Sequence, residues 1–504
     1  MASAISAVDQ PCITRGRIDL TSRASEPQTT NAVDIGSWQP AEGLAEQARL
    51  IADGKMSAVD AVSAALDRAE HSQSTINAFK LILRDEALAA AKIVDKQIAA
   101  GERKPLLGVP IAVKDDMDIA GHPTAFGCPG EFEPKTEDGE MARRLRESGA
   151  IIIGKTNSPE IGQWSVTAGP AFGITRNPWN LDHTPGGSSG GASAAVAAGV
   201  LPAAVGSDGA GSVRIPASWT NLVGIKPTRG RVSSWPDYEA FNGIAVIGPL
   251  ARTVGDAALL LDAITGNHPN ERHQLSPPDR PFADSALTTP RKLRIALSFK
   301  IPFSGVPAKL DPVVRGRVER LAGVLENLGH TVVPAEPSYS FPGLNFLPRS
   351  TNGVARWADR APDATLLDHR TRELTRTGNL LGGPILKLAR SYEGVLRRRI
   401  GKTFREFDVI LTPTTAVPPF EADAIDGLGA WATDKLIVGG CPYAWTWNVL
   451  GWPGVNVPAG FVGDRLPVGA QLLGQAGSEP LLISLAAQLE HHERWHELRP
   501  PNFD

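Results

Sequence analysis

The sequence predicts an α/β protein in which helices cover both faces of a β-sheet. Short apolar runs bounded by Gly alternate with stretches of helical periodicity, as expected for strands alternating with helices. The composition is globular, with 42% apolar and 21% charged residues. No internal repeat and no long linker divides the 504 residues, so we expect one large domain.

The elements follow one another from Glu42 onward. Residues 1–40 are rich in Ser, Thr, Asp and Gln and lack the apolar block of a signal peptide, so we expect an extension with little regular structure before a domain at 41–504. Helical spacing begins at Glu42, and Ser57 is suited to cap a second helix. Further helices are expected at 85–99, 141–148, 192–199, 311–328 and 388–407, and strands at 108–114, 150–153, 293–297, 331–333 and 409–411.

Charge and cysteine content exclude several classes of protein. The chain has 51 Lys and Arg against 54 Asp and Glu, a net charge of -3, which gives no basic surface for nucleic acid or an anionic membrane. No apolar stretch is long enough to cross a bilayer. Cys12, Cys128 and Cys441 are widely spaced and form no metal-binding pattern, so we expect a cytoplasmic protein without a metal site.

Two Gly-rich loops each present a serine. Ser188 lies in GGSSGG, which runs directly into a stretch of small residues, and Ser212 follows Gly209-Ala-Gly. A nucleophilic serine needs backbone N–H groups free to face a developing oxyanion, and small residues leave them accessible. A phosphate-binding loop is one alternative, but the GK[ST] ending of a P-loop is missing. A turn that the serine merely caps is another.

A serine nucleophile also needs a base. The ten histidines are scattered and none accompanies a GxSxG motif. Lys114 ends the apolar run VPIAV, and burial there would favour the neutral amine, which can accept a proton. The alternative is a lysine that emerges into solvent beside Asp115 and Asp116.

Together these stretches resemble the amidase signature family of serine hydrolases, in particular its free-standing actinobacterial-type amidases. The resemblance covers nearly the whole chain from about Glu42. It implies one α/β/α domain with a mixed central sheet, amidase activity, and no cofactor or metal. The matching segments are GVPIAVKDDMD, AIIIGKTNSPEIG, FGITRNPWN, TPGGSSGG, SDGAGSVRIPA, GIKPTRGRVS, GPLARTVGDAALLLDAITG and LPVGAQLLG.

The resemblance also implies a Ser–Ser–Lys triad. In that family the first serine of GGSSGG precedes a second serine by 24 positions, which is the spacing from Ser188 to Ser212. Ser212 would attack an amide carbonyl and carry the acyl group, while Ser188 passes the proton to neutral Lys114. The expected oxyanion donors are the backbone N–H groups of Gly209, Ala210, Gly211 and Ser212.

The resemblance also bears on two further features of the nucleophile loop. Asp208 and Arg214 match positions that brace the loop in relatives, and we interpret them as a structural ion pair. The more common family loop has Gly where this chain has Ala210. We expect the enzyme to remain catalytic despite this change, but the substrates of the better-known family members are not expected to apply to this chain.

The substrate is expected to be a small amide or carbamate with an apolar or aryl group. Trp164 and Ser165 belong to a loop predicted to form one wall of the pocket, opposite the aromatic stretch around Trp447. The alternative is that those aromatics are core residues. Loops within 341–386 are expected to set specificity, with esters and urethanes also cleaved. We expect a monomer or homodimer; the alternatives are a subunit that releases ammonia from glutamine and a non-catalytic scaffold.

Overall fold

The computed structural model describes residues 39–303, 305–463, 465–501 and 503. The expected N-terminal extension therefore lies almost entirely outside the described residues. These described residues form the strands β1 (Phe79–Ile82), β2 (Pro110–Lys114), β3 (Ile151–Thr156), β4 (Ala168–Gly169), β5 (Gly173–Ile174), β6 (Ala203–Asp208), β7 (Val223–Lys226), β8 (Val246–Ala251), β9 (Arg294–Leu297), β10 (Thr331–Pro334), β11 (Val409–Pro413), β12 (Gly454–Val462) and β13 (Leu466–Leu473).

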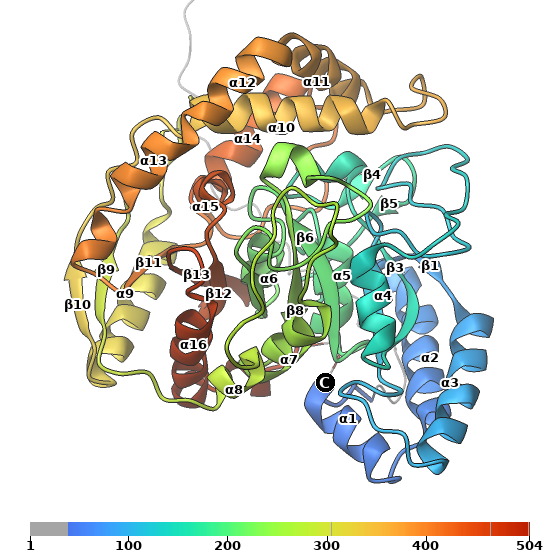
Figure 1. The fold of residues 1–504 in the computed structure, drawn as a ribbon. Helices are drawn as coiled ribbons and strands as arrows, with labels where there is room; N and C mark the ends of the chain where they lie inside the picture. Colours follow the sequence, from blue (N-terminus) through green and yellow to red (C-terminus); the bar gives the residue numbers. More distant parts are fainter. Residues whose placement is uncertain (1–38, 304, 464, 502, 504) are drawn as a thin grey trace, which may run out of the picture. The chain divides into compact units, whose positions relative to one another are not determined.

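Eleven of these strands form one mixed sheet (Figure 1). Their order is β1-β3-β2-β6-β8-β7-β12-β13-β11-β9-β10, and β4 and β5 make a separate hairpin. Strand β2 runs parallel to β3 and β6, and β9 runs parallel to β10 and β11. The remaining neighbours are antiparallel. The expected mixed sheet is confirmed.

Helices cover both faces of this sheet, and strand β2 shows how the sequence achieves it. Successive side chains of a strand point to opposite faces. Ile111 and Val113 pack in a core with residues of α1, α4, α7, α9 and α16, whereas Ala112 packs in another core with α2, α3 and α5. These helices are α1 (Leu44–Ala52), α2 (Ala58–Ile76), α3 (Arg84–Ala99), α4 (Glu140–Glu147), α5 (Gly190–Ala197), α7 (Val254–Ile264), α9 (Pro312–Asn327) and α16 (Glu479–Glu493).

The other helices lie between these elements or in the C-terminal third of the chain. They are α6 (Arg214–Trp219), α8 (Phe282–Ala286), α10 (Gly343–Ala358), α11 (His369–Leu380), α12 (Gly383–Ser391), α13 (Glu393–Ile400), α14 (Ala430–Gly440) and α15 (Trp445–Leu450), with short 3-10 turns η1 (Glu160–Gly162), η2 (Ala240–Gly243), η3 (Thr403–Arg405) and η4 (Trp495–Glu497). No helix of the described residues is long and apolar enough to span a bilayer.

Local sequence signals placed the early elements correctly. Ser57 caps α2, since its hydroxyl accepts a hydrogen bond from the Asp60 N–H at 2.9 Å. The predicted helix 388–407 is wrong in extent: Tyr392 separates two helices, α12 and α13, which Figure 1 shows one after the other. The start of α13 is fixed there by Glu393, which pairs with the buried guanidinium groups of Arg229 and Arg349.

The segment 341–386, within which loops were expected, is mainly helical. Its residues 349–353 lie inside α10 despite their Ser, Thr, Asn and Gly content. Tertiary contacts override the local propensity here. Arg349 is buried and donates to the Asn242 carbonyl at 3.0 Å, and Gly353 packs so closely on Phe241 that an added Cβ would lie 2.5 Å from the ring.

Candidate active site

The three residues predicted to form a triad are brought to one cavity by the sheet. Lys114 is the last residue of β2, Ser188 lies just before α5, and Ser212 follows β6. Because β2 and β6 are parallel neighbours, their carboxyl ends meet at the same edge of the sheet. All three residues line a cavity of about 360 Å³.

Lys114 is fully buried and hydrogen-bonded to two hydroxyl groups. Its Nζ lies 2.7 Å from Ser188 Oγ and 2.8 Å from Ser207 Oγ, and 3.5 Å from the Asp116 carboxylate. Burial lowers the pKa of Lys114 below its ordinary value, although Asp116 opposes the shift. The alternative of a solvent-exposed lysine is therefore wrong. The Gly187–Ser188 peptide bond that presents the Ser188 hydroxyl is cis.

The backbone around Ser212 depends on a glycine. Gly211 has φ +113°, and a Cβ at that position would lie 2.5 Å from the Ala444 Cβ. The Ser212 carbonyl accepts from the Ser189 N–H at 3.2 Å, which ties the two serine loops together. The Ser212 hydroxyl has no hydrogen-bond partner among the described residues and is left to face the cavity.

One of the four expected oxyanion donors is already occupied. The Gly211 N–H donates to Asp208 Oδ1 at 2.8 Å. Because a donor held by a buried carboxylate is not free for an oxyanion, the prediction of Gly211 as an oxyanion donor is wrong. The N–H groups of Gly209, Ala210 and Ser212 donate to no other group in the described part of the chain.

Asp208 and Arg214 form the expected ion pair beneath this loop. The pair is fully buried, with Arg214 Nη2 3.0 Å from Asp208 Oδ1. Burial alone would raise the pKa of Asp208, but the charge and hydrogen bonds of Arg214 outweigh it and hold the pKa below the usual range. Two partners were missed from the sequence: the Asn448 amide donates to Asp208 Oδ1 at 2.8 Å, and Gln471 Oε1 accepts from Arg214 at 2.8 Å.

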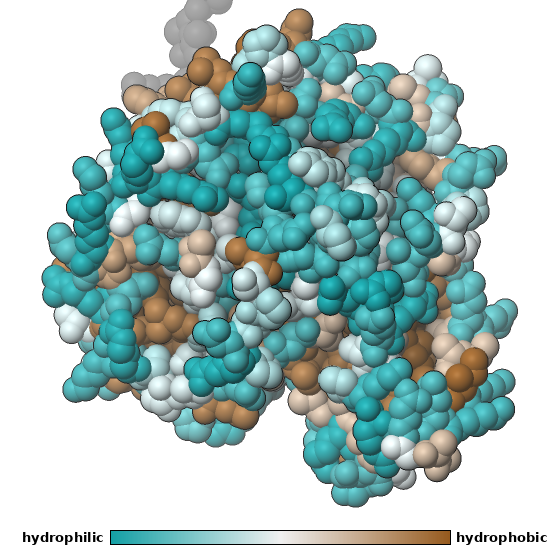
Figure 2. Space-filling view, in the orientation of Figure 1, coloured by the Kyte–Doolittle hydropathy of each residue, from teal (hydrophilic) through white to brown (hydrophobic). Residues whose placement is uncertain are grey.

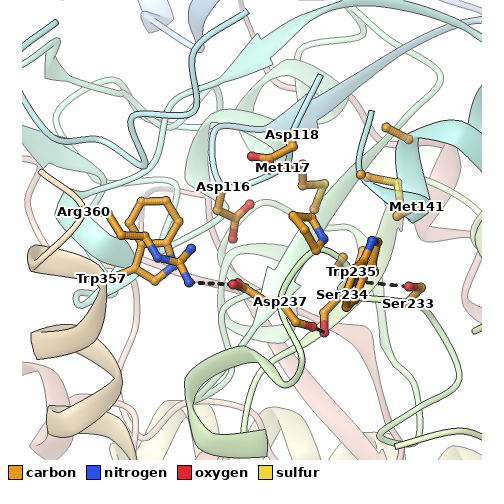
Figure 3. Close-up of a pocket in the computed structure, with 14 residues that line it drawn as sticks. Asp116, Met117, Asp118, Met141, Ser233, Ser234, Trp235, Asp237, Trp357 and Arg360 are labelled. Carbon is orange, nitrogen blue, oxygen red and sulfur yellow. Dashed lines mark hydrogen bonds and ion pairs between the residues drawn. The ribbon is translucent and has the colours of Figure 1, made fainter. Parts of the chain in front are cut away.

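Asp116 and Ser207 are also part of the site and were not singled out from sequence. The Ser207 hydroxyl donates to Asp116 Oδ2, while Asp116 Oδ1 has no partner among the described residues. Asp116 also lines a separate cavity of about 50 Å³, where Figure 3 shows it near Trp357 and the Arg360–Asp237 ion pair of 2.6 Å. Asp116 thus lies between Lys114 and this smaller cavity.

The larger cavity is lined mainly by apolar side chains. Trp164 and Ser165 line it, as expected, but Trp447 does not. Trp447 is buried in a core cluster, where its indole N–H donates to the Gly474 carbonyl at 2.9 Å, and Trp445 lines the cavity instead. The aromatic and larger aliphatic lining residues are Phe126, Ile161, Trp164, Ile215, Phe241, Ile244, Phe303, Leu344, Phe346, Leu347, Val354, Leu374, Ile437, Val438 and Trp445.

The cavity opens beside α10. Leu344 and Leu347 line it and are nevertheless 66% and 52% exposed, which marks its mouth. Apolar side chains gather on the surface over α10–α12, at the top of Figure 2. An apolar substrate would therefore meet an apolar entrance.

Comparisons with known proteins agree with this fold and show the family of the chain. The family model described as Amidase matches residues 60–483, and the chain belongs to this family, the amidase signature enzymes. It is 55% identical to the protein named "Putative amidase AmiA2" of Mycobacterium tuberculosis, covering 85% of this chain and 88% of that protein. It is 34% identical to a glutamyl-tRNA(Gln) amidotransferase subunit of Pseudomonas fluorescens, covering 91% and 99%.

Two solved structures extend the comparison. The substrate complex of 6-aminohexanoate cyclic dimer hydrolase has a TM-score of 0.84 at 29% identity, covering 92% of this chain and 99% of that one. A bacterial aryl acylamidase has a TM-score of 0.82 at 25% identity, covering 92% and 98%. The protein is therefore an amidase-type enzyme that acts on C–N bonds.

Proposed function

We propose that this enzyme hydrolyses apolar or aryl amides through an acyl-enzyme on Ser212. The observation that carries the proposal is one cavity that combines an apolar lining with Lys114, Ser188 and Ser212 at its wall. The lining would hold the hydrophobic part of a substrate, while the serine hydroxyl is left without a competing partner.

The proposed mechanism passes a proton from Ser212 through Ser188 to Lys114, and the Ser188–Lys114 link is already hydrogen-bonded. Ser212 Oγ attacks the amide carbonyl, and its proton passes through the Ser188 hydroxyl to neutral Lys114, 2.7 Å away. The same relay then protonates the leaving nitrogen. Water attacks the acyl group and gives its proton to the relay; the bond between the acyl carbon and Ser212 Oγ then breaks, and the relay returns a proton to Oγ as the acid leaves.

The developing oxyanion would be held by backbone N–H groups that nothing else occupies. We assign this role to the amides of Gly209, Ala210 and Ser212, since Gly211 is held by Asp208. The Asp208–Arg214 pair acts indirectly by fixing the loop. Esters and urethanes present the same carbonyl geometry, so we also propose that activated members of both classes acylate Ser212.

Release of ammonia from glutamine is the alternative amidotransferase function. Free glutamine carries a carboxylate that needs a cationic partner. Among the described lining residues the only cation-forming side chain is that of Lys114, which is held by two hydroxyl groups. The lining therefore favours an apolar amide.

A panel of substrates tests the proposed function. We expect a higher kcat/KM for an apolar anilide than for glutamine, with measurable cleavage of the matching ester and urethane. Activity on glutamine alone would refute the apolar specificity but leave the triad standing. No activity on any substrate, together with no covalent labelling of Ser212, would support the non-catalytic scaffold.

A further inference from the structure

One carboxylate stands unpaired in the wall of the large cavity. Asp434 of α14 and Lys114 are the acidic and basic side chains among the described lining residues. Lys114 is held by Ser188 and Ser207. The Asp434 carboxylate forms no hydrogen bond or ion pair with any other described residue, and partial burial is the cause of its shifted pKa. Asp434 is partly buried among the apolar residues of the cavity wall. A carboxylate that loses part of its hydration without gaining a partner is destabilised, so a cationic ligand at this position would be favourable.

The helix itself shows that Asp434 faces the cavity. Asp434, Ile437, Val438 and Cys441 follow the i, i+3, i+4, i+7 spacing of one helical face, and all four line the cavity. The other three are apolar or only weakly polar, so an aspartate is the exception on this face. Its apolar surroundings raise the pKa of Asp434 to about 6.

We propose that Asp434 binds an ammonium group of the substrate, so that the enzyme accepts amides whose apolar chain carries a primary amine. The inference rests on the proposed hydrolysis at Ser212. The ammonium group would pair with the carboxylate and offset its loss of hydration. The chain between the amine and the scissile amide would lie against the apolar lining.

The geometry of α14 indicates how long the substrate chain between the amine and the scissile amide must be. At the C-terminal end of the helix, Cys441 Sγ lies 3.5 Å from Ser165 Oγ. The backbone of Ser165 in turn packs against Gly187, where an added Cβ would lie 3.0 Å from the Ser165 carbonyl carbon. Gly187 directly precedes the candidate catalytic residue Ser188. Asp434 is seven residues earlier, about 10 Å along the helix axis. Chains too short to bridge a distance of that order should gain nothing from the amine.

Paired substrates test the proposal. We would measure kcat/KM for para-nitroanilides of straight-chain acids that end in ammonium or in methyl, over a series of lengths, and for a second series with the ammonium on the amine side. In the wild type we expect the ammonium member to be favoured by about tenfold or more in one series, above a threshold length. Asp434→Asn and Asp434→Ala should abolish this ratio.

A matched control removes the same charge elsewhere. Asp426 is exposed, lies outside the cavity lining and precedes α14, so Asp426→Asn should retain the preference. The inference is overturned if the wild type shows no preference in either series, or if Asp434→Asn keeps the wild-type ratio.

Binding without turnover separates this inference from the proposed function. Ser212→Ala protein, titrated in a calorimeter, should bind an n-alkylammonium ion more tightly than the alcohol of equal length, and the added Asp434→Asn change should remove the difference. This result with no hydrolysis by the wild type would refute hydrolysis at Ser212 while supporting Asp434 as an ammonium site. Hydrolysis without any binding preference would overturn the Asp434 inference alone.

Discussion

Lys114 Nζ and Ser188 Oγ lie 2.7 Å apart although the two residues are separated by 74 positions in the sequence. The contact joins the end of a central strand to the loop before α5 and places a buried amine within proton-transfer distance of a hydroxyl. Such a pair can take the proton of a serine nucleophile, provided that the amine is neutral.

Replacing Ser212 by Ala should abolish turnover. Loss of a nucleophile in serine hydrolases costs on the order of 1,000-fold or more in rate. We would measure anilide hydrolysis and the thermal midpoint of unfolding. Ser218→Ala is the control, since that hydroxyl is buried without a hydrogen-bond partner among the described residues. Normal activity of folded Ser212→Ala protein would refute the assignment.

The pH profile should report the neutral form of Lys114. Burial lowers the pKa of Lys114, so kcat/KM should rise from acid to alkaline pH with an apparent pKa below the ordinary value of about 10.4. Lys114→Ala should lose most activity, and Lys114→Arg should not restore it, because a guanidinium group does not give up its proton. An active Arg variant would contradict the role of Lys114 as the base.

Asp116 should affect the apparent pKa of this pH profile. Its carboxylate lies 3.5 Å from Lys114 Nζ and favours the charged ammonium. Asp116→Asn should therefore lower the apparent pKa of the acid limb, by about one unit. Asp118→Asn serves as the control, since Asp118 pairs with Lys135 at 3.4 Å. An unchanged or raised apparent pKa in Asp116→Asn would show that Asp116 does not act on Lys114.

Two neighbouring glycines should differ sharply when changed to Ala. A Cβ at Gly211 would meet Ala444 Cβ at 2.5 Å and would sit at φ +113°, whereas a Cβ at Gly209 would lie 3.6 Å from the nearest atom. Gly211→Ala should lower the free energy of unfolding by about 1–3 kcal/mol. Gly209→Ala should change it much less, which urea unfolding of both variants would check. Equal losses would contradict the assigned loop geometry.

Lys226 should make stability depend on pH. Burial lowers the pKa of Lys226 to about 7, and its Nζ donates to the Pro227 carbonyl at 3.0 Å. An unfolded lysine titrates near 10.4, so between about pH 7 and pH 10 the unfolded state binds more protons and the free energy of unfolding rises with pH. Lys226→Met should flatten this rise. The exposed Lys92→Met variant should keep it, and equal slopes in all three proteins would contradict the prediction.

Features encoded in contiguous residues could be predicted from sequence. An apolar run ending at Lys114 predicts a buried strand end, and small residues after Ser188 predict a closely packed helix; both are present. The Gly-rich loop around Ser212 likewise predicts an accessible backbone. In each case the local sequence pattern and the tertiary packing favour the same structure.

Features set by distant contacts could not be predicted. Asn448 and Gln471 reach the Asp208–Arg214 pair from α15 and β13, and nothing near them in sequence indicates this. The choice of Trp447 over Trp445 failed for a geometric reason. Residues two positions apart project from nearly opposite sides of a helix, and the register of α15 was not known.

Covalent labelling tests the central claim most directly. We would treat the wild-type protein and Ser212→Ala with a fluorophosphonate, measure the intact masses and map the modified peptide. The account predicts one added label on the wild type, located on Ser212, and none on the variant. A label on a different residue, or equal labelling of both proteins, would contradict the assignment of Ser212 as the nucleophile.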